Sequence, residues 1–306
     1  MNITMFLDYL LEQDRAERTI DSYQRDLAHF ATWFEQTTGR TPDPVRVTPL
    51  DIREYRQFLK TIKRLKPASV NRKLAALKTY FGWARDAGLV VNNPTDGIKS
   101  VGQTETKQRW LSRGQAFALT RAATEAIQLA ETKGLRSSTI FAKRNAAIVA
   151  VLLPGLRVSE VCDLELIDVT LKPRSGFVIV RSGKGGRYRE VPLNKDARGA
   201  LQTWLDVRPE NGSPVLFPSR NDEPVQPRDI QRMLDKLAHS ASSLDPEEVT
   251  PHKLRHTFGK SLVDAGVSLD RVAMLMGHQD LVTTAIYTTP SREDLTAAVE
   301  KIAWQD

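Results

Sequence analysis

The stretch TPHKLRHTFGKSLVDAG, residues 250–266, determines how the C-terminal part of this chain is interpreted. A helix is expected over residues 252–265, which places His252 and Arg255, three positions apart, on one face. His252 and His256 have the spacing of a metal-binding pair, but the stretch lacks the glutamate of a metalloprotease helix, and no third ligand is evident. No metal site is therefore predicted, and His252 and Arg255 become candidate functional residues.

A histidine and a tyrosine that follow this helix are further candidate functional residues. His278 comes directly after Gly277, where a helix predicted over residues 269–277 should end. Tyr287 lies nine residues further on, in a short polar helix predicted over residues 281–287. Alone, His278 could satisfy helix-end carbonyl groups, and Tyr287 could be a core tyrosine with a solvated hydroxyl. The position of each residue alone therefore does not indicate a function.

An arginine begins a short predicted helix upstream of this region. Arg157 follows a Pro-Gly break at residues 154–155, and the helix is expected to run over residues 157–166. Arg157 could simply pair with Glu160 or Asp163. Its position at a helix start is therefore compatible with both a structural and a functional role.

A glycine-rich turn follows, between two short β-rich runs. Residues 177–180 and 188–191 are predicted to pair as a hairpin around SGKGG, which places Lys184 at or near the tip. The turn lacks the spacing of a nucleotide-binding loop, and an exposed turn lysine is the commonest fate of such a residue. A functional role for Lys184 depends on its neighbours in the fold.

Considered as one set, these residues suggest a site that transfers a phosphoryl group without a metal. A phosphodiester under attack gains negative charge, which fixed cations and hydrogen-bond donors would stabilise. Guanidinium groups suit this task because their planar fork grips phosphate oxygens in pairs, and a phenol is a credible nucleophile. The set comprises Arg157, Lys184, His252, Arg255, His278 and Tyr287.

The N-terminal part of the chain is predicted to form a small all-α domain over residues 1–91. A polar stretch with Gly and Pro, residues 92–108, is expected to be a linker, and a mixed α and β domain should occupy residues 109–306. Thr48, with Asp51 three residues later, is a plausible helix cap. The N-terminal helices are expected over residues 3–14, 19–38, 48–60 and 67–87.

Basic residues are concentrated between positions 53 and 73, where the only acid is Glu54. They could form a solvated helical face or a face that contacts phosphates, since neutralised phosphates are the main source of DNA affinity. The whole chain carries 44 Lys and Arg against 37 Asp and Glu, a net charge of +7, which makes nucleic acid a plausible partner. The eight residues are Arg53, Arg56, Lys60, Lys63, Arg64, Lys66, Arg72 and Lys73.

Composition excludes several other classes of protein. The chain has 306 residues and one cysteine, Cys162, so it can hold neither an internal disulfide framework nor a zinc site built from cysteines. Its longest wholly apolar run, residues 146–153, is far short of the roughly 20 residues that span a bilayer. The N-terminus carries acids where a secretory signal would be positive. A cytoplasmic protein without a membrane partner is predicted.

Four short motifs together resemble the tyrosine recombinase, or phage integrase, family, and the layout is most similar to compact Xer-type recombinases. The N-terminal stretch ERTIDSYQRDLAHFATWF also looks like that family's core-site DNA-binding helices. The resemblance covers nearly the whole chain. The motifs are PGLRVSEVCDL (154–164), SGKGGRYREVPL (182–193), TPHKLRHTFGKSLVDAG (250–266) and MLMGHQDLVTTAIYT (274–288).

The resemblance implies roles for the charged members of the set. Arg157 matches the first catalytic arginine, and Glu160 matches an acidic position that orients it. Arg255 matches the arginine of the family's H-x-x-R pair, and Lys184 matches the hairpin lysine, the expected general acid. A departure from the family's pattern is MGH, at Met276, where LGH is commoner.

The resemblance also implies a nucleophile and a reaction. Tyr287 matches the nucleophile, His252 its proton acceptor, and His278 a donor to the phosphate oxygen. The implied reaction forms a 3′-phosphotyrosyl link and exchanges strands through a four-way junction, with no metal, cofactor or ATP. The implied partners are double-stranded DNA with a short core site and a tetramer, either of one chain or with a paralogous recombinase.

Alternatives remain open at this point. A type IB topoisomerase would share the site without strand exchange, and a non-catalytic DNA-binding protein would share only the fold. Within the recombinases, dimer resolution, integration or excision of a mobile element, and cointegrate resolution are all compatible. The expected fold is mainly α with a small β-hairpin or sheet. An apolar helical face at the C-terminus would dock on the next protomer or pack on its own chain: Leu295, Ala298, Val299 and Ile302.

Overall fold

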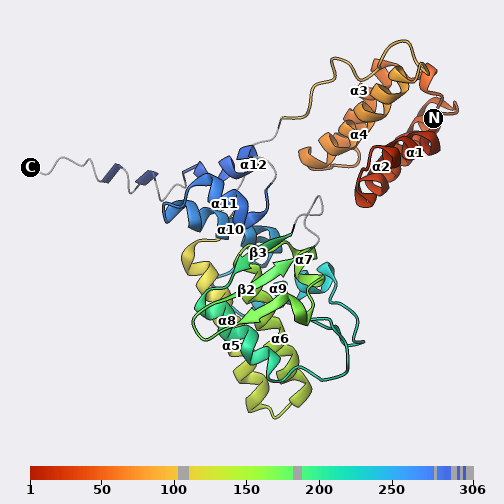
Figure 1. The fold of residues 1–306 in the computed structure, drawn as a ribbon. Helices are drawn as coiled ribbons and strands as arrows, with labels where there is room; N and C mark the ends of the chain where they lie inside the picture. The colour runs from red at the N-terminus through yellow and green to blue at the C-terminus, as the bar shows by residue number, and fades with distance from the viewer. Residues whose placement is uncertain (103–109, 182–187, 279–280, 291–294, 297–298, 301–306) are drawn as a thin grey trace, which may run out of the picture. The chain divides into compact units, whose positions relative to one another are not determined.

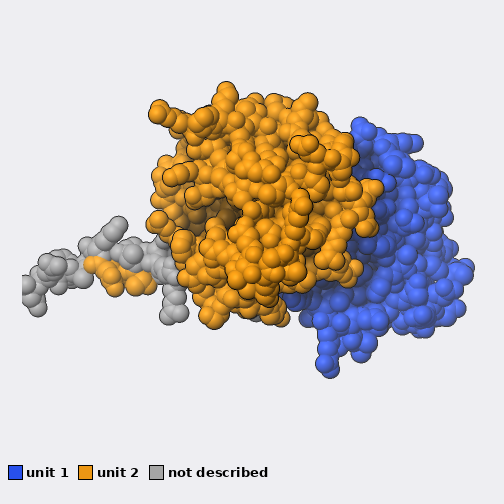
Figure 2. All heavy atoms as spheres, turned by 90° about the horizontal axis from the view of Figure 1, so that it is seen from below, with its two compact units in different colours: residues 1–106 blue, residues 107–306 orange. Residues whose placement is uncertain are grey.

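The computed structural model describes the whole chain except residues 103–109, 182–187, 279–280, 291–294, 297–298 and 301–306. The chain divides into two compact units, Met1–Thr106 and Lys107–Asp306, which Figure 2 distinguishes by colour. Each unit has a hydrophobic core of its own. No helix within the described residues is long and apolar enough to cross a membrane.

The described part of unit 1 is all-helical, as predicted (Figure 1). The chain turns out of α2 at Gly39, whose φ of 67° is in the left-handed region that favours glycine. Thr48 and Asp51 form the expected capping box at the start of α3. The helices are α1 (Ile3–Glu12), α2 (Glu17–Thr38), α3 (Pro49–Thr61) and α4 (Pro67–Asp86).

Aromatic rings fill the core of unit 1. Phe30 and Tyr55 meet edge to face with centroids 5.0 Å apart, and both side chains are fully buried. The chain after α4 also packs on this core, because Ile98 is buried and Asn71 exchanges two hydrogen bonds with the backbone of Val101. The first part of the polar stretch predicted as a linker is thus attached to unit 1, and its residues 103–108 lie outside the described ones.

Unit 2 packs helices and a small sheet around one core. Helix α6 lies against α5 and α8, and α9 packs on α5 (Figure 1). A capping box between Ser112 and Gln115 begins α5. The helices of this core are α5 (Arg113–Thr132), α6 (Arg136–Leu152), α7 (Val158–Cys162), α8 (Lys195–Leu205) and α9 (Pro227–His239).

The sheet of unit 2 contains the two predicted strands and a third that the sequence analysis missed. Strand β2 (Gly176–Val180) pairs antiparallel with β3 (Arg189–Pro192), with Val178 opposite Val191. Strand β1 (Val169–Leu171) pairs with the other edge of β2. Three residues are too few to show an alternating pattern, so only pairing with β2 reveals that β1 is a strand.

Helix α7 is shorter than predicted. It ends at Cys162, whereas the apolar pattern predicted a helix to residue 166. The backbone of Leu164 and Leu166 instead forms hydrogen bonds with residues Pro214 and Leu216, far along the chain. These non-local bonds satisfy the backbone groups of both residues outside a helix.

Residues 251–288 contribute to a smaller hydrophobic cluster in unit 2. Val272, Met276 and Tyr287 are buried together, and Phe258 packs against them. Of the apolar face predicted at the C-terminus, Leu295 and Val299 are exposed, and Ala298 and Ile302 lie outside the described residues. The elements are α10 (Pro251–Asp264), α11 (Leu269–Met276), α12 (Leu281–Ala285) and the 3₁₀ turn η4 (Ile286–Thr288).

Candidate active site

Two predicted arginines hold three distant segments of unit 2 together. Arg157, at the start of α7, donates from Nη2 to the carbonyl oxygen of Gly277, 2.9 Å away. Arg255, buried in α10, donates from its two Nη atoms to the carbonyl oxygens of Gly155 and Met276. The starts of α7 and α10 and the end of α11 therefore meet at this pair of guanidinium groups.

Glu160 connects this arrangement to the sheet. Its carboxylate accepts hydrogen bonds from Arg157 Nη1 at 2.7 Å and from Arg189 Nη2 and Nη1 at 2.7 and 2.9 Å. Burial raises the pKa of Glu160, but the bonds from Arg189 and Arg157 outweigh burial and hold that pKa below its ordinary value. Glu160 thus stays ionised and fixes both guanidinium groups.

Arg189 is a functional candidate that the sequence analysis missed. It lies on β3, two residues from the buried Val191, and the outward-facing Glu190 stands between them. Because side chains along a strand point alternately to its two faces, Arg189 lies on the same inward face as Val191. A cation on that face needs an acidic partner. That signal was present in SGKGGRYREVPL, but the partner, Glu160, is 29 residues away in sequence.

Arg255 stays charged although its environment opposes the charge. Burial and the neighbouring positive charge of Arg157 lower the pKa of Arg255 to about 10, so the guanidinium is protonated at neutral pH. Together with Arg157 it provides two fixed cations in one region of the site. Such a pair suits an anion with several oxygens, such as a phosphate.

His278 lies immediately after the left-handed Gly277, next to these cations. Its backbone N–H donates to Ala273, and its Nδ1 is 2.9 Å from the hydroxyl of Thr284. Burial, and then the charges of Arg255 and its neighbours, lower the pKa of His278 to about 4. The imidazole is therefore neutral near pH 7 and offers a hydrogen bond without a further positive charge.

Tyr287 lies between His278 and α10. The ring of Tyr287 is 1% exposed and stacks near that of His278, with centroids 6.2 Å apart. It also lies against Gly259 of α10, where a Cβ would come within 2.5 Å of the tyrosine Cζ. The phenol is thus held by packing, and its hydroxyl is 3.0 Å from Nδ1 of His256.

His256 is the second residue whose importance sequence reasoning missed. The spacing of His252 and His256 was noticed, and a metal was the only role considered for the pair. In the structure the two Nε2 atoms lie 2.8 Å apart, while the opposite ring nitrogen of His256 contacts Tyr287. His252 is exposed on the first turn of α10. Lys184 lies outside the described residues.

The predicted DNA-binding residues of unit 1 differ in what they contact. Arg72 and Lys73 form ion pairs with the buried carboxylate of Asp26, so they balance a charge within the unit. Arg56 donates to the carbonyl oxygen of Lys99. The remaining predicted residues are exposed on and after α3: Arg53, Lys60, Lys63, Arg64 and Lys66.

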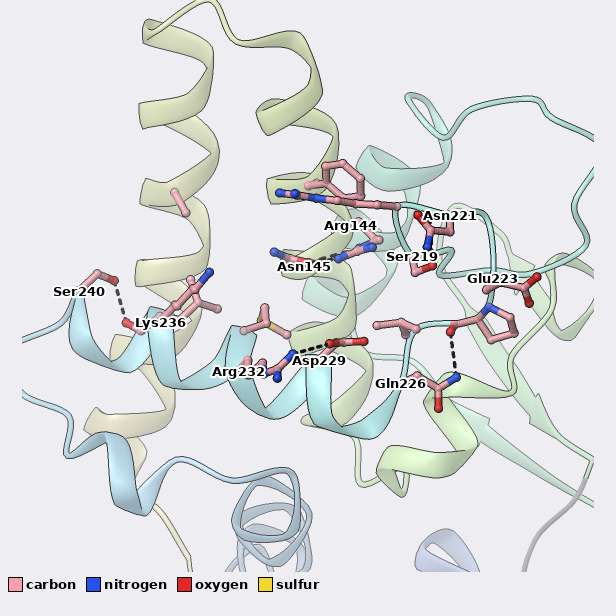
Figure 3. Close-up of a pocket in the computed structure, with 17 residues that line it drawn as sticks. Arg144, Asn145, Ser219, Asn221, Glu223, Gln226, Asp229, Arg232, Lys236 and Ser240 are labelled. Carbon is pink, nitrogen blue, oxygen red and sulfur yellow. Dashed lines mark hydrogen bonds and ion pairs between the residues drawn. The ribbon is translucent and has the colours of Figure 1, made fainter.

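A separate cavity of about 960 Å³ lies between α5, α6, α9 and the loop before α9 (Figure 3). Arg144 points into it from α6, donates to Asn145, and has a pKa that burial lowers to about 10. None of the described residues predicted for the site lines this cavity. The candidate active site is therefore the cluster around Arg157, Arg255 and Tyr287.

Comparisons with known proteins bear on both units. Residues 117–294 match the family described as "Phage integrase family", and residues 3–88 match "Phage integrase, N-terminal SAM-like domain". The chain is 31% identical over 292 residues to a tyrosine recombinase XerC of Pelobacter propionicus, covering 95% of this chain and 90% of that protein. A XerC of Erythrobacter litoralis is 33% identical over 291 residues, with 95% and 87% covered.

Solved structures share the fold. The crystal structure of XerA recombinase is 27% identical and gives a TM-score of 0.53, covering 99% of this chain and 98% of that one. The Tn1549 transposon integrase in complex with transposon right end DNA gives a TM-score of 0.72 at 21% identity, covering 99% and 100%. The arrangement of helices and sheet in this chain thus has close structural counterparts.

Proposed function

Because the chain belongs to the phage integrase family and is a tyrosine-type site-specific recombinase, we propose that it cleaves DNA through a covalent bond to Tyr287. The phenolic oxygen attacks a phosphodiester, giving a 3′-phosphotyrosyl link and a free 5′-hydroxyl. A hydroxyl from a partner strand then attacks that link and releases the tyrosine. The observation that carries this proposal is the meeting of Arg157, Arg255, His278 and Tyr287 from four separate segments.

The cations of the site have a defined part in this reaction. The phosphorane-like transition state carries more negative charge than the diester, so fixed donors lower its free energy more than that of the ground state. Arg157 and Arg255 supply the charge, and Glu160 and the backbone carbonyl of Gly277 hold Arg157 in place. His278, whose lowered pKa leaves it neutral near pH 7, is proposed to add one N–H donor.

The reaction as proposed needs neither ATP nor a metal. One phosphoester replaces another at each step, so the bond energy is retained in the tyrosyl link. Lys184 is proposed as the acid that protonates the leaving 5′-oxygen, since a lysine can donate a proton where it is positioned at the leaving group. The guanidinium groups take the role that a Lewis acid would otherwise fill.

Double-stranded DNA with a short core site is the proposed substrate. The exposed cations on and after α3 are proposed to contact its phosphates, and the name of the Tn1549 integrase structure states that it holds transposon DNA. We further propose that four protomers act on two paired sites and pass through a four-way junction. The XerC relatives favour a recombinase of this class. The tetramer is proposed to contain either one kind of subunit or this chain together with a paralogue.

Covalent capture tests the proposal directly. Wild type, Tyr287→Phe and the control Tyr9→Phe would be incubated with sheared host DNA in EDTA and stopped in SDS, and the attached DNA would be sequenced. We expect adducts at one imperfect palindrome for wild type and Tyr9→Phe and none for Tyr287→Phe.

Other outcomes would reject parts of the proposal. Adducts scattered over many sequences would favour a topoisomerase. Adducts in Tyr287→Phe at the wild-type level would move the nucleophile to another residue. Cleavage that is lost in EDTA and restored by Mg²⁺ would reject the metal-free mechanism. The genomic position of the captured palindrome would distinguish chromosome maintenance from mobile-element transfer.

A further inference from the structure

Three side chains form a continuous hydrogen-bonded chain from the nucleophile to the surface. The hydroxyl of Tyr287 is 3.0 Å from Nδ1 of His256, and Nε2 of His256 is 2.8 Å from Nε2 of His252. Tyr287 is buried, His256 is half-buried, and His252 is exposed. Exposure to solvent therefore increases along this series of hydrogen bonds, from the phenol of Tyr287 to His252.

We propose that His256 takes the phenolic proton of Tyr287 directly and relays its other proton to His252. This inference rests on the proposed function of Tyr287 as the nucleophile. It gives the histidine of the H-x-x-R pair the role of terminal acceptor and places His256 in contact with the reacting oxygen. His256 is then a catalytic residue that neither its spacing nor the family resemblance identified.

The protons balance through two transfers. Before reaction, the Tyr287 hydroxyl donates to Nδ1 of His256, and the Nε2–H of His256 donates to the bare Nε2 of His252. Afterwards Nδ1 of His256 holds the phenolic proton, Nε2 of His256 is bare, and His252 is an imidazolium. The phenolate oxygen bonds to phosphorus, the bond from phosphorus to the 5′-oxygen breaks, and a separate acid protonates that oxygen.

The two Nε2 atoms are within hydrogen-bond distance of each other. Only one proton fits between two nitrogen atoms 2.8 Å apart, so one ring always donates and the other accepts. Both histidines stand on α10, four residues apart, with ring centroids 4.2 Å apart and planes at 78°. The relay therefore runs along a rigid helix rather than across a loop.

The relay also solves an electrostatic problem. A proton kept on the half-buried His256 would add a third cation to a site that already holds Arg157 and Arg255, and both burial and nearby like charges disfavour a protonated imidazole. Passing the charge to the exposed His252 places it in water, where it is hydrated and exchanges with solvent. The phenolate is thereby formed without increasing the positive charge beside the phenol.

The test compares two substitutions at position 256. In His256→Asn the side-chain oxygen occupies about the place of Nδ1, so it accepts a hydrogen bond from Tyr287 but transfers no proton. His256→Phe removes both nitrogen atoms and keeps a ring. The rate of adduct formation would be measured with enzyme in excess on a nicked duplex carrying the captured site, together with DNA affinity and melting temperature. His239→Asn, an exposed histidine of α9, is the matched control.

We expect both variants at position 256 to form adducts about 100-fold more slowly or worse, the usual range for loss of a general base, with unchanged DNA affinity. A wild-type rate for His256→Asn together with a slow His256→Phe would show that the ring only positions the phenol, and would overturn the relay. A His256→Asn variant that melts like wild type excludes misfolding as the cause.

A modified substrate separates the two proton transfers. A sulfur in place of the bridging 5′-oxygen leaves without needing a proton. We expect this substrate to restore cleavage by Lys184→Ala but not by His256→Asn. Restoration of His256→Asn would assign His256 to the leaving group and reject the relay.

The double variant tests whether the two histidines act in series. In a relay, His252→Asn combined with His256→Asn is no slower than His256→Asn alone, because the chain is already broken. Independent contributions would multiply and contradict the relay. If wild type forms no Tyr287-dependent adduct, the recombinase mechanism itself fails; if wild type and His256→Asn form adducts equally fast, only the relay fails.

Discussion

Gly259 of α10 lies flat against the ring of Tyr287. A Cβ added at Gly259 would lie 2.5 Å from Cζ of the tyrosine and 2.8 Å from the sulfur of Met276. The position of the phenol is thus defined by the absence of a single methyl group on the facing helix. The position of Tyr287, the proposed nucleophile, is therefore sensitive to a substitution at Gly259 that changes no polar group.

Replacing Gly259 by alanine should displace Tyr287 and slow adduct formation by at least about tenfold, because overpacking a rigid contact shifts the groups that meet there. DNA affinity should stay unchanged. Gly199→Ala in α8 is the control, since a Cβ there meets nothing within 4 Å. Equal rates for the two variants, measured on a nicked substrate, would contradict the packing argument.

Replacing Glu160 by glutamine should destabilise unit 2. The change leaves Arg157 and Arg189 beside a neutral amide, and breaking a buried ion pair costs about 3–5 kcal/mol. The free energy of unfolding at pH 7 from urea denaturation would measure this, with Glu190→Gln on the exposed face of β3 as control. Equal free energies of unfolding for the two variants would show that the buried carboxylate is dispensable.

The same carboxylate predicts a pH dependence. Since the folded state lowers the pKa of Glu160 from 4.5, its contribution to stability is complete above that pH and is lost as the pH falls through the lower folded value. Wild type should therefore lose more unfolding free energy than Glu160→Gln between neutral pH and pH 3. Equal losses of unfolding free energy in the two proteins would show that Glu160 does not contribute to destabilisation by acid.

His278 should titrate far below an ordinary histidine. Its pKa falls from 6.5 to about 4, so the folded state resists protonation, and this contribution to stability is complete above pH 6.5 and lost as the pH falls toward 4. The C2 proton of His278, followed by NMR, should shift with a midpoint near that lower value. Arg157→Gln should raise the midpoint because it removes a neighbouring cation; an unchanged midpoint would show that Arg157 does not contribute to the lowered pKa.

The basic residues of unit 1 should separate into two functional classes. Lys60→Gln and Arg64→Gln should weaken DNA binding, and each should reduce the slope of log K against log salt by about one if its cation neutralises one phosphate. Lys73→Met should instead lower the stability of unit 1, because it leaves the buried carboxylate of Asp26 with less compensation. Salt titrations and urea denaturation of all three variants would check this division.

Local signals in the sequence were sufficient for most of the fold. The capping pair Thr48 and Asp51 and the end of α2 at residue 38 depend on a few neighbouring residues, and both were confirmed. The mainly helical class with a small sheet was also confirmed. Strand β1 and the early end of α7 were not predicted, because they are set by pairing with segments that lie elsewhere in the chain.

The same limit applied to the candidate site. Arg157 and Tyr287 could be selected from motif patterns, whereas the importance of Arg189 and His256 depends on what lies opposite them in three dimensions. The alternation of inward and outward side chains along β3 and the i,i+4 spacing of the histidines on α10 can be seen in the sequence. Neither pattern identifies the residue that Arg189 or His256 contacts. Both residues were missed because their partners lie far away in the sequence, not because the sequence lacked a pattern.

The anchoring of Arg255 and Arg157 to carbonyl oxygens has a consequence for how this site tolerates mutation. Both arginines grip the main chain at Met276 and Gly277, so the side chain at position 276 contributes only apolar volume to the surrounding cluster. Substitutions that conserve that volume leave the guanidinium groups where they are. Replacing Met276 by leucine, a residue of similar volume, is therefore expected to leave the chemistry of the site intact.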